Sequence, residues 1–177
     1  MKGNKEEEYK TLVTKEQFYR LADNYKPLKF VKQLNHYYVS DDPSHYAFRI
    51  REKEGKKIFT MKEPCDGARM EYEKELDTDI DKDIEIVEML KGKGLQPPYE
   101  LLLGDMTTYR AIYFDGYGEL CFDINLYSGL IDYEIEYEKI NERDGFKEEF
   151  IKILKRADID YEPSSSKYHR YLKTKGR

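Results

Sequence analysis

The most constraining feature of the chain is a two-residue alternation of charged and apolar side chains, clearest at residues 131–140, IDYEIEYEKI. Successive side chains of a β-strand point to opposite faces, so such a run has one charged face and one apolar face. Similar alternation, separated by short polar or glycine-containing breaks, recurs along the chain. The pattern predicts about eight strands, at residues 5–12, 29–40, 45–53, 56–63, 69–76, 107–114, 118–127 and 131–140.

Three other segments have the spacing of amphipathic helices. The first opens on a capping box from Thr14 to Gln17, and the helices are expected at residues 14–25, 80–90 and 146–154. Short connections between strands imply antiparallel pairing, which tends to close into a barrel or fold into a sandwich. We therefore expect an α+β fold, mainly antiparallel β, in which about eight strands form a barrel or a sandwich with helices packed outside.

Length and the end of the chain set the expected domain organisation. The 177 residues are long enough for one domain, expected at residues 1–177, with a core at 5–160 and a basic tail or lid at 161–177. After Pro163 the chain has five Lys or Arg residues and no acid. The sequence leaves open whether this tail closes over the barrel or frays into solvent.

Composition excludes several classes of function. The net charge of −5 is unlike that of a general nucleic-acid binder, and no apolar run approaches the ~18 residues that a membrane span needs. Cys65 and Cys121 match no metal or redox spacing, and no secretory apolar region is present. We expect a reducing, cytoplasmic location. A homodimer through an exposed tyrosine-rich face is left open.

The charged faces of the expected strands are segregated by sign. Carboxylates recur on the first strand, on the strand at 69–76 and on the last two, whereas cations recur at 45–53 and 56–63. One interpretation is an ordinary half-buried sheet with a solvated charged face. If the helices cover the apolar faces, however, the charged faces point into the barrel. Paired carboxylates then suit Mg²⁺ or Mn²⁺, and arginines suit phosphate oxygens, so the pattern favours a metal–polyphosphate site.

These residues resemble, in order, the motifs of the CYTH superfamily, the triphosphate tunnel metalloenzymes. The N-terminal ExExK motif is present at residues 6–10 and an Arg-x-Arg strand at 48–52. The remaining matches are Thr60-Met61-Lys62, Glu71-Tyr72-Glu73, Arg110, the acidic strand at 120–123 and the closing acidic strand at 133–138. The order and length are those of a small bacterial member.

The resemblance implies that the antiparallel strands form a closed eight-stranded barrel, a tunnel that binds triphosphate, with the helices packed outside. It also implies roles for individual residues. Implied metal ligands are Glu6, Glu8, Asp123, Glu134 and Glu136. Implied phosphate-binding residues are Lys10, Arg49, Arg51, Lys62 and Arg110, with Lys167 of the tail as a further candidate. Candidates for catalytic or orienting roles are Lys10, Glu71, Glu73 and either Tyr37 or Tyr38. Thr108 stands where some relatives have a lysine, and Glu7, on the opposite strand face, is expected to matter little.

The resemblance leaves several activities open. Family members hydrolyse inorganic triphosphate, thiamine triphosphate or RNA 5′-triphosphates, or they cyclise ATP as the class IV type of adenylate cyclase. The leading hypothesis is a triphosphatase that uses Mg²⁺ or Mn²⁺ and a small triphosphate-containing substrate. Alternatives are an adenylate cyclase, a polyphosphate- or nucleotide-binding module without turnover, and a structural barrel without a ligand.

Overall fold

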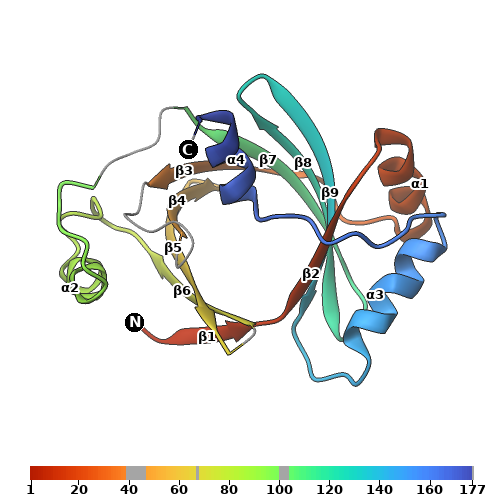
Figure 1. Cartoon of the computed structure of the whole chain (residues 1–177), viewed down its shortest axis with the longest axis horizontal. Helices are drawn as coiled ribbons and strands as arrows, with labels where there is room; N and C mark the ends of the chain where they lie inside the picture. Colours follow the sequence, from red (N-terminus) through yellow and green to blue (C-terminus); the bar gives the residue numbers. More distant parts are fainter. Residues whose placement is uncertain (39–46, 67, 100–103, 177) are drawn as a thin grey trace.

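The computed structural model describes residues 1–38, 47–66, 68–99 and 104–176. Its centre is one antiparallel sheet in the order β1-β6-β5-β4-β3-β7-β8-β9-β2, curled into a ring of strands (Figure 1). The strands are β1 Gly3–Glu6, β2 Glu8–Val13, β3 Val31–Tyr38, β4 Ala47–Lys53, β5 Lys56–Cys65, β6 Ala68–Glu75, β7 Met106–Phe114, β8 Gly118–Tyr127 and β9 Leu130–Lys139. The expected fold class is confirmed.

The N-terminal segment closes the ring. β1 pairs with β6 and β2 pairs with β9, and only Glu7 separates β1 from β2. One segment of chain therefore bridges the two ends of the sheet. The single strand expected at residues 5–12 is divided in two, so the described strands number nine rather than the expected eight.

Two apolar clusters lie outside the barrel, under helices. Helix α1 (Lys15–Tyr25) and helix α3 (Phe146–Lys155) bury residues such as Phe18 and Phe150 against the outer faces of β8 and β9. Helix α2 (Ile84–Gly92) buries Ile86 and Leu90 against β4 and β5. Because each strand alternates, burying the apolar face under a helix turns the charged face toward the barrel interior.

The helix boundaries follow their caps. Thr14 accepts a hydrogen bond from the backbone amide of Gln17 at 3.2 Å, and the Gln17 side chain accepts one from the amide of Thr14 at 2.9 Å. The second helix begins at Ile84, later than the expected residue 80, because Asp83 caps it through the amide of Ile86. No helix in the described part of the chain is long and apolar enough to cross a membrane.

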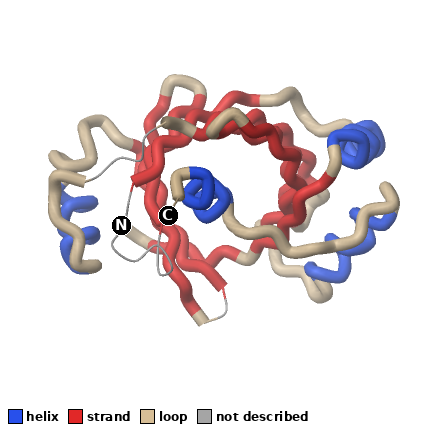
Figure 2. The backbone as a smooth tube through the Cα atoms, turned by 45° about the horizontal axis from the view of Figure 1, so that its top comes forward, coloured by secondary structure: helices blue, strands red, loops and turns tan. Residues whose placement is uncertain are grey.

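The basic tail contains a fourth helix, α4 (Lys167–Thr174), which was not among the three helices expected from the sequence. Ser166 caps it, and its Tyr168, Tyr171 and Leu172 pack with Tyr37 and other residues on the barrel wall. Figure 2 shows α4 within the outline of the ring of strands. The preceding segment is tied to β2 by a hydrogen bond from the Ser164 amide to the Lys10 carbonyl, 3.2 Å.

Candidate active site

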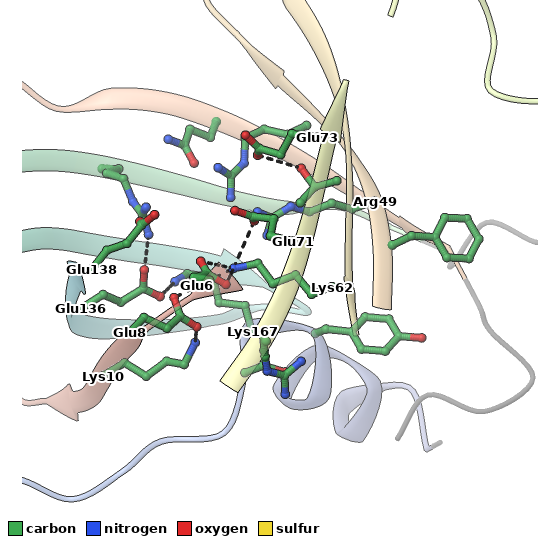
Figure 3. A pocket seen from close by; sticks show the side chains of 18 of the residues that line it. Glu6, Glu8, Lys10, Arg49, Lys62, Glu71, Glu73, Glu136, Glu138 and Lys167 are labelled. Carbon is green, nitrogen blue, oxygen red and sulfur yellow. Dashed lines mark hydrogen bonds and ion pairs between the residues drawn. The ribbon is translucent and has the colours of Figure 1, made fainter. Parts of the chain in front are cut away.

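The barrel interior contains a cavity of about 240 Å³ lined mainly by charged side chains (Figure 3). Carboxylates come from β1, β2, β6, β8 and β9, whereas cations come from β2, β4, β5, β6, β7 and α4. The acidic residues are Glu6, Glu8, Glu71, Glu73, Glu119, Glu136 and Glu138, and the basic ones are Lys10, Arg49, Arg51, Lys53, Lys62, Arg69, Arg110 and Lys167.

Lys62 joins the acids of three strands. Its Nζ lies 2.6 Å from Glu6 Oε1, 3.2 Å from Glu71 Oε1 and 4.0 Å from Glu8 Oε2. Glu71 is its direct cross-strand neighbour on β6, so this contact is set by strand register. Burial lowers the pKa of Lys62, but the surrounding carboxylates outweigh it and raise the pKa above its usual value. Lys62 is therefore a fixed ammonium group among the acids.

The two acids of the N-terminal motif have opposite pKa shifts. Burial raises the pKa of Glu6 to about 7, with Glu8 and Glu71 adding to the rise and Lys62 opposing it. Burial also acts to raise the pKa of Glu8, but Lys62 and Lys10 outweigh it and bring this pKa to about 2. Near neutral pH, Glu8 is thus an anion while Glu6 titrates.

One acidic group has the donor set of a hard divalent cation. Carboxylate oxygens of Glu6, Glu71 and Glu138 all lie within 4.8 Å of one another. Mg²⁺ and Mn²⁺ prefer oxygen ligands, so these donors fit such an ion. A neighbouring group of Glu119, Cys121 and Glu138 fits less well, because burial raises the pKa of the Cys121 thiol and keeps it protonated.

A second acidic group, formed by Asp123, Glu134 and Glu136, is already paired with protein cations. The Lys167 ammonium contacts all three carboxylates, at 2.8 Å from Asp123. Arg170 donates to Glu134 at 2.7 Å. Arg110 donates to both oxygens of Asp123, at 2.7 and 2.6 Å, and also contacts Glu136. The carboxylates and α4 thus form one buried charge network.

Arg49 and Arg51 on β4 have no carboxylate partner among the described residues. Arg51 Nε donates to Asn35 Oδ1 at 3.0 Å, and Arg49 Nη1 donates to the Tyr37 hydroxyl at 3.3 Å. Arg49 Nε is buried and makes no hydrogen bond within residues 1–38, 47–66, 68–99 and 104–176. Burial, together with the neighbouring Arg49 and Arg110, lowers the pKa of Arg51 to about 9. This side of the cavity has unneutralised positive charge suited to an anion.

Most of the residues singled out from the sequence line this one cavity. They are Glu6, Glu8, Lys10, Tyr37, Arg49, Arg51, Lys62, Glu71, Glu73, Arg110, Glu136 and Lys167. Tyr38 lies elsewhere, with its ring stacked on Phe48 at 5.3 Å between centroids. Asp123 and Glu134 are fully buried in the network beneath α4.

Sequence reasoning did not assign roles to Glu138 and Asn35. Glu138 continues the alternation of Glu134 and Glu136 on β9 and pairs in register with Glu8 of β2, so the two-residue spacing was a usable signal. Asn35 had no such signal, because its importance comes from a contact between neighbouring strands.

A closed antiparallel barrel with acids and guanidinium groups facing each other across its interior defines a charge-lined tunnel protein. Residues 4–172 match the family model of the CYTH domain, and the chain belongs to this family. One relative, "Putative triphosphatase YjbK" of Bacillus subtilis (strain 168), is 28% identical over 180 residues, which cover 95% of this chain and 94% of that protein.

Solved structures share the same architecture. A crystal structure of a "putative adenylate cyclase" from Bacillus halodurans is 32% identical, covers 97% of this chain and 100% of its own, and has a TM-score of 0.83. The Hippeastrum protein HpAC1, described as a "putative adenylyl cyclase" with a dominant triphosphatase activity, is 23% identical and has a TM-score of 0.75 over 95% of each chain. At 23% identity, the similarity to HpAC1 supports the assignment of the fold alone.

Proposed function

We propose that the protein is a metal-dependent hydrolase of triphosphates, acting on inorganic triphosphate, thiamine triphosphate or a nucleoside triphosphate. One observation carries the proposal: a cavity of about 240 Å³ has an oxygen-donor group of Glu6, Glu71 and Glu138, and also two arginines that pair with no carboxylate of the described residues. The name of the Bacillus subtilis relative agrees with this activity.

The residues divide into two tasks. Glu6, Glu71 and Glu138, with Glu8 beside them, would hold Mg²⁺ or Mn²⁺. When bound, such an ion neutralises phosphate charge and polarises phosphorus–oxygen bonds. Arg49 and Arg51 would bind the phosphate oxygens through their guanidinium groups.

Water would attack the terminal phosphorus in line with the leaving phosphate oxygen. The charge that develops on the transferred group would be stabilised by Arg51 and by the fixed ammonium of Lys62. Lys10, held beside Glu8, and Glu73, which accepts from the Thr60 hydroxyl at 3.3 Å, are the candidates for orienting the water.

An adenylate cyclase is the second candidate, favoured by the name of the Bacillus halodurans structure at 32% identity. In that reaction the ribose 3′-oxygen attacks the α-phosphorus, so the same cationic groups would bind the phosphates. A binding module without turnover is less well supported, because carboxylates facing the phosphate site weaken simple anion binding and become useful when a cation is bound.

The test is release of phosphate from inorganic triphosphate, thiamine triphosphate, ATP and pyrophosphate, with Mg²⁺ or Mn²⁺, while cyclic AMP is assayed in parallel. We expect divalent-dependent phosphate release from at least one triphosphate and none in excess EDTA. Cyclic AMP as the product from ATP would replace the hydrolase with the cyclase. Binding of inorganic triphosphate without any product would support the binding module.

A further inference from the structure

Six of the cations that line the tunnel are held in two different ways. Lys10, Lys62, Arg110 and Lys167 are each paired with at least one carboxylate. Arg49 and Arg51 instead bond to uncharged oxygen atoms on β3, those of Tyr37 and Asn35. In both cases the partner is the directly opposed residue of the neighbouring strand, Tyr37 opposite Arg49 and Asn35 opposite Arg51. The same arrangement thus occurs twice, two residues apart on one face.

Asn35 is fixed in a single orientation. Its side chain is fully buried, and its Nδ2 donates to the backbone carbonyl of Met106 on β7 at 3.1 Å. Because the amide nitrogen is engaged with β7, the amide oxygen faces β4 and accepts from Arg51 Nε. The Nη groups of Arg51 make no hydrogen bond to a described residue, and the side chain lines the cavity. Asn35 therefore orients the guanidinium without neutralising it.

Tyr37 holds Arg49 in a comparable way. Its hydroxyl accepts from Arg49 Nη1, and its ring centroid lies 5.9 Å from Arg49 Cζ, a cation–π distance. The ring is packed against Tyr168 and Tyr171 of α4, with centroids 5.5 and 5.7 Å away, and only 2% of the residue is exposed. Tyr37 is thus immobilised by the terminal helix, and Arg49 Nε has no hydrogen-bond partner in the part of the chain that the structure describes.

We propose that Asn35 and Tyr37 are positioning residues that present Arg49 and Arg51 to the substrate as an oriented, unneutralised pair of positive charges. The inference rests on the proposed triphosphate hydrolysis and deepens it, because it names what gives the cavity its affinity for a phosphate chain. A carboxylate at either position would orient the guanidinium equally well but would cancel its charge. A neutral oxygen orients it and leaves the charge for the ligand.

The experiment measures the Kd of inorganic triphosphate by titration calorimetry in EDTA, so that binding is separated from metal-dependent turnover. Asn35→Asp keeps the shape of the side chain and adds a negative charge beside Arg51. We expect its Kd to rise by about tenfold or more, because a charge-assisted contact to phosphate is weakened. Tyr37→Phe removes only the hydroxyl and should raise the Kd by about threefold to tenfold with little change in Tm. In turnover assays both variants should have a lower kcat/KM, mainly because KM is higher.

Asn125→Ala is the matched control, because Asn125 is also a fully buried asparagine of the tunnel but bonds to Thr108 and Asp132. It should lower Tm, as we also expect for Asn35→Ala, yet leave the Kd within about twofold of the parent, whereas Asn35→Ala should raise the Kd because Arg51 loses its orienting partner. Unchanged triphosphate affinity in Tyr37→Phe and in folded Asn35→Asp would overturn the inference. Should Asn35→Asp fail to fold, Tyr37→Phe and Asn35→Ala take its place, and unchanged triphosphate affinity in both would overturn the inference.

The outcomes also separate the inference from the proposed function. Binding by the parent without turnover, weakened in both variants, would overturn the hydrolase while supporting the positioning role. Turnover by the parent with unchanged affinity in both variants would support the hydrolase and overturn the positioning role. A parent that neither binds nor hydrolyses triphosphate would overturn both.

Discussion

The ammonium of Lys167 lies 2.8 Å from a carboxylate oxygen of Asp123, at the centre of a buried group of three acids. Lys167 belongs to α4, whereas the acids belong to β8 and β9, so this contact joins the end of the chain to the barrel wall. The side chain of Asp123 is fully buried and that of Lys167 is 8% exposed. The terminal helix is therefore bound to the barrel by charge as well as by its aromatic residues.

Replacing Lys167 with Met should strongly destabilise the protein, because three buried carboxylates lose their central cation. Breaking a buried ion pair typically costs about 3–5 kcal/mol, and thermal or urea unfolding would measure it. Lys173→Met removes an exposed lysine of the same helix and should change stability little. Adding Asp123→Asn to Lys167→Met should recover part of the loss. Equal stability of the two single Lys variants would contradict the network.

Replacing Glu138 with Gln should weaken binding of Mn²⁺ or Mg²⁺, because one of the three clustered oxygen donors loses its charge. Saturating Mn²⁺ should raise the Tm of the parent, and this stabilisation should be reduced in the variant. Divalent-dependent turnover should fall by about 100-fold. Glu7→Gln is the control, since Glu7 pairs with Lys139 at 3.0 Å and does not line the cavity. Equal Mn²⁺ stabilisation of both variants would remove Glu138 from the site.

Replacing Arg51 with Ala should raise the KM for triphosphate by about tenfold or more, because an oriented guanidinium is lost from the anion site. Arg51→Lys retains the charge but not the planar fork, and it should recover only part of the affinity. Lys57→Ala, at an exposed position of β5, should leave the KM unchanged. An equal rise in KM in Lys57→Ala would indicate that triphosphate is held by general electrostatic attraction and not by a specific subsite.

Metal-free stability should decrease as the pH rises from about 4.5 to about 7, because the pKa of Glu6 is 4.5 as a free group and about 7 in the folded protein. In this window the folded state binds more protons than the unfolded state, so raising the pH favours unfolding. Glu134 and Glu138 contribute in the same direction, because burial raises their pKa values too.

Glu6→Gln isolates the contribution of Glu6. The Tm of the variant relative to the parent should increase between pH 5 and 7.5, by on the order of 5 °C. Thermal unfolding in EDTA at several pH values measures the difference. Parallel curves for the two proteins would show that Glu6 keeps an ordinary pKa in the fold.

The alternation of charged and apolar residues was enough to predict the strands and their charged faces, whereas the closed barrel and the roles of its lining residues came from the resemblance to the CYTH motifs. A period of two places Arg49 and Arg51 on one face and Phe48 on the other, whatever the neighbouring strands are. The division of the first strand at Glu7 was not predictable, because it depends on that segment pairing with both β6 and β9.

The contacts of the terminal helix were also beyond the sequence pattern. Tyr168, Tyr171 and Leu172 have the i, i+3, i+4 spacing of an amphipathic helix, so the helix itself had a usable signal. Lys167 and Arg170 are buried because carboxylates of β8 and β9 receive them. Such pairing between distant segments has no local signal. The choice between Tyr37 and Tyr38 was open for a related reason, since it depends on which strand face turns inward.

The division of the N-terminal segment at Glu7 has a consequence for the order in which the chain can assemble during synthesis. β2 leaves the ribosome early, yet its partner β9 follows only after every other strand has been made. Until then, the growing sheet has unpaired edges, which are the sites where chains pair with one another and aggregate. Ring closure is therefore a late event of translation, and a ribosome that stalls before β9 would release a chain with open strand edges.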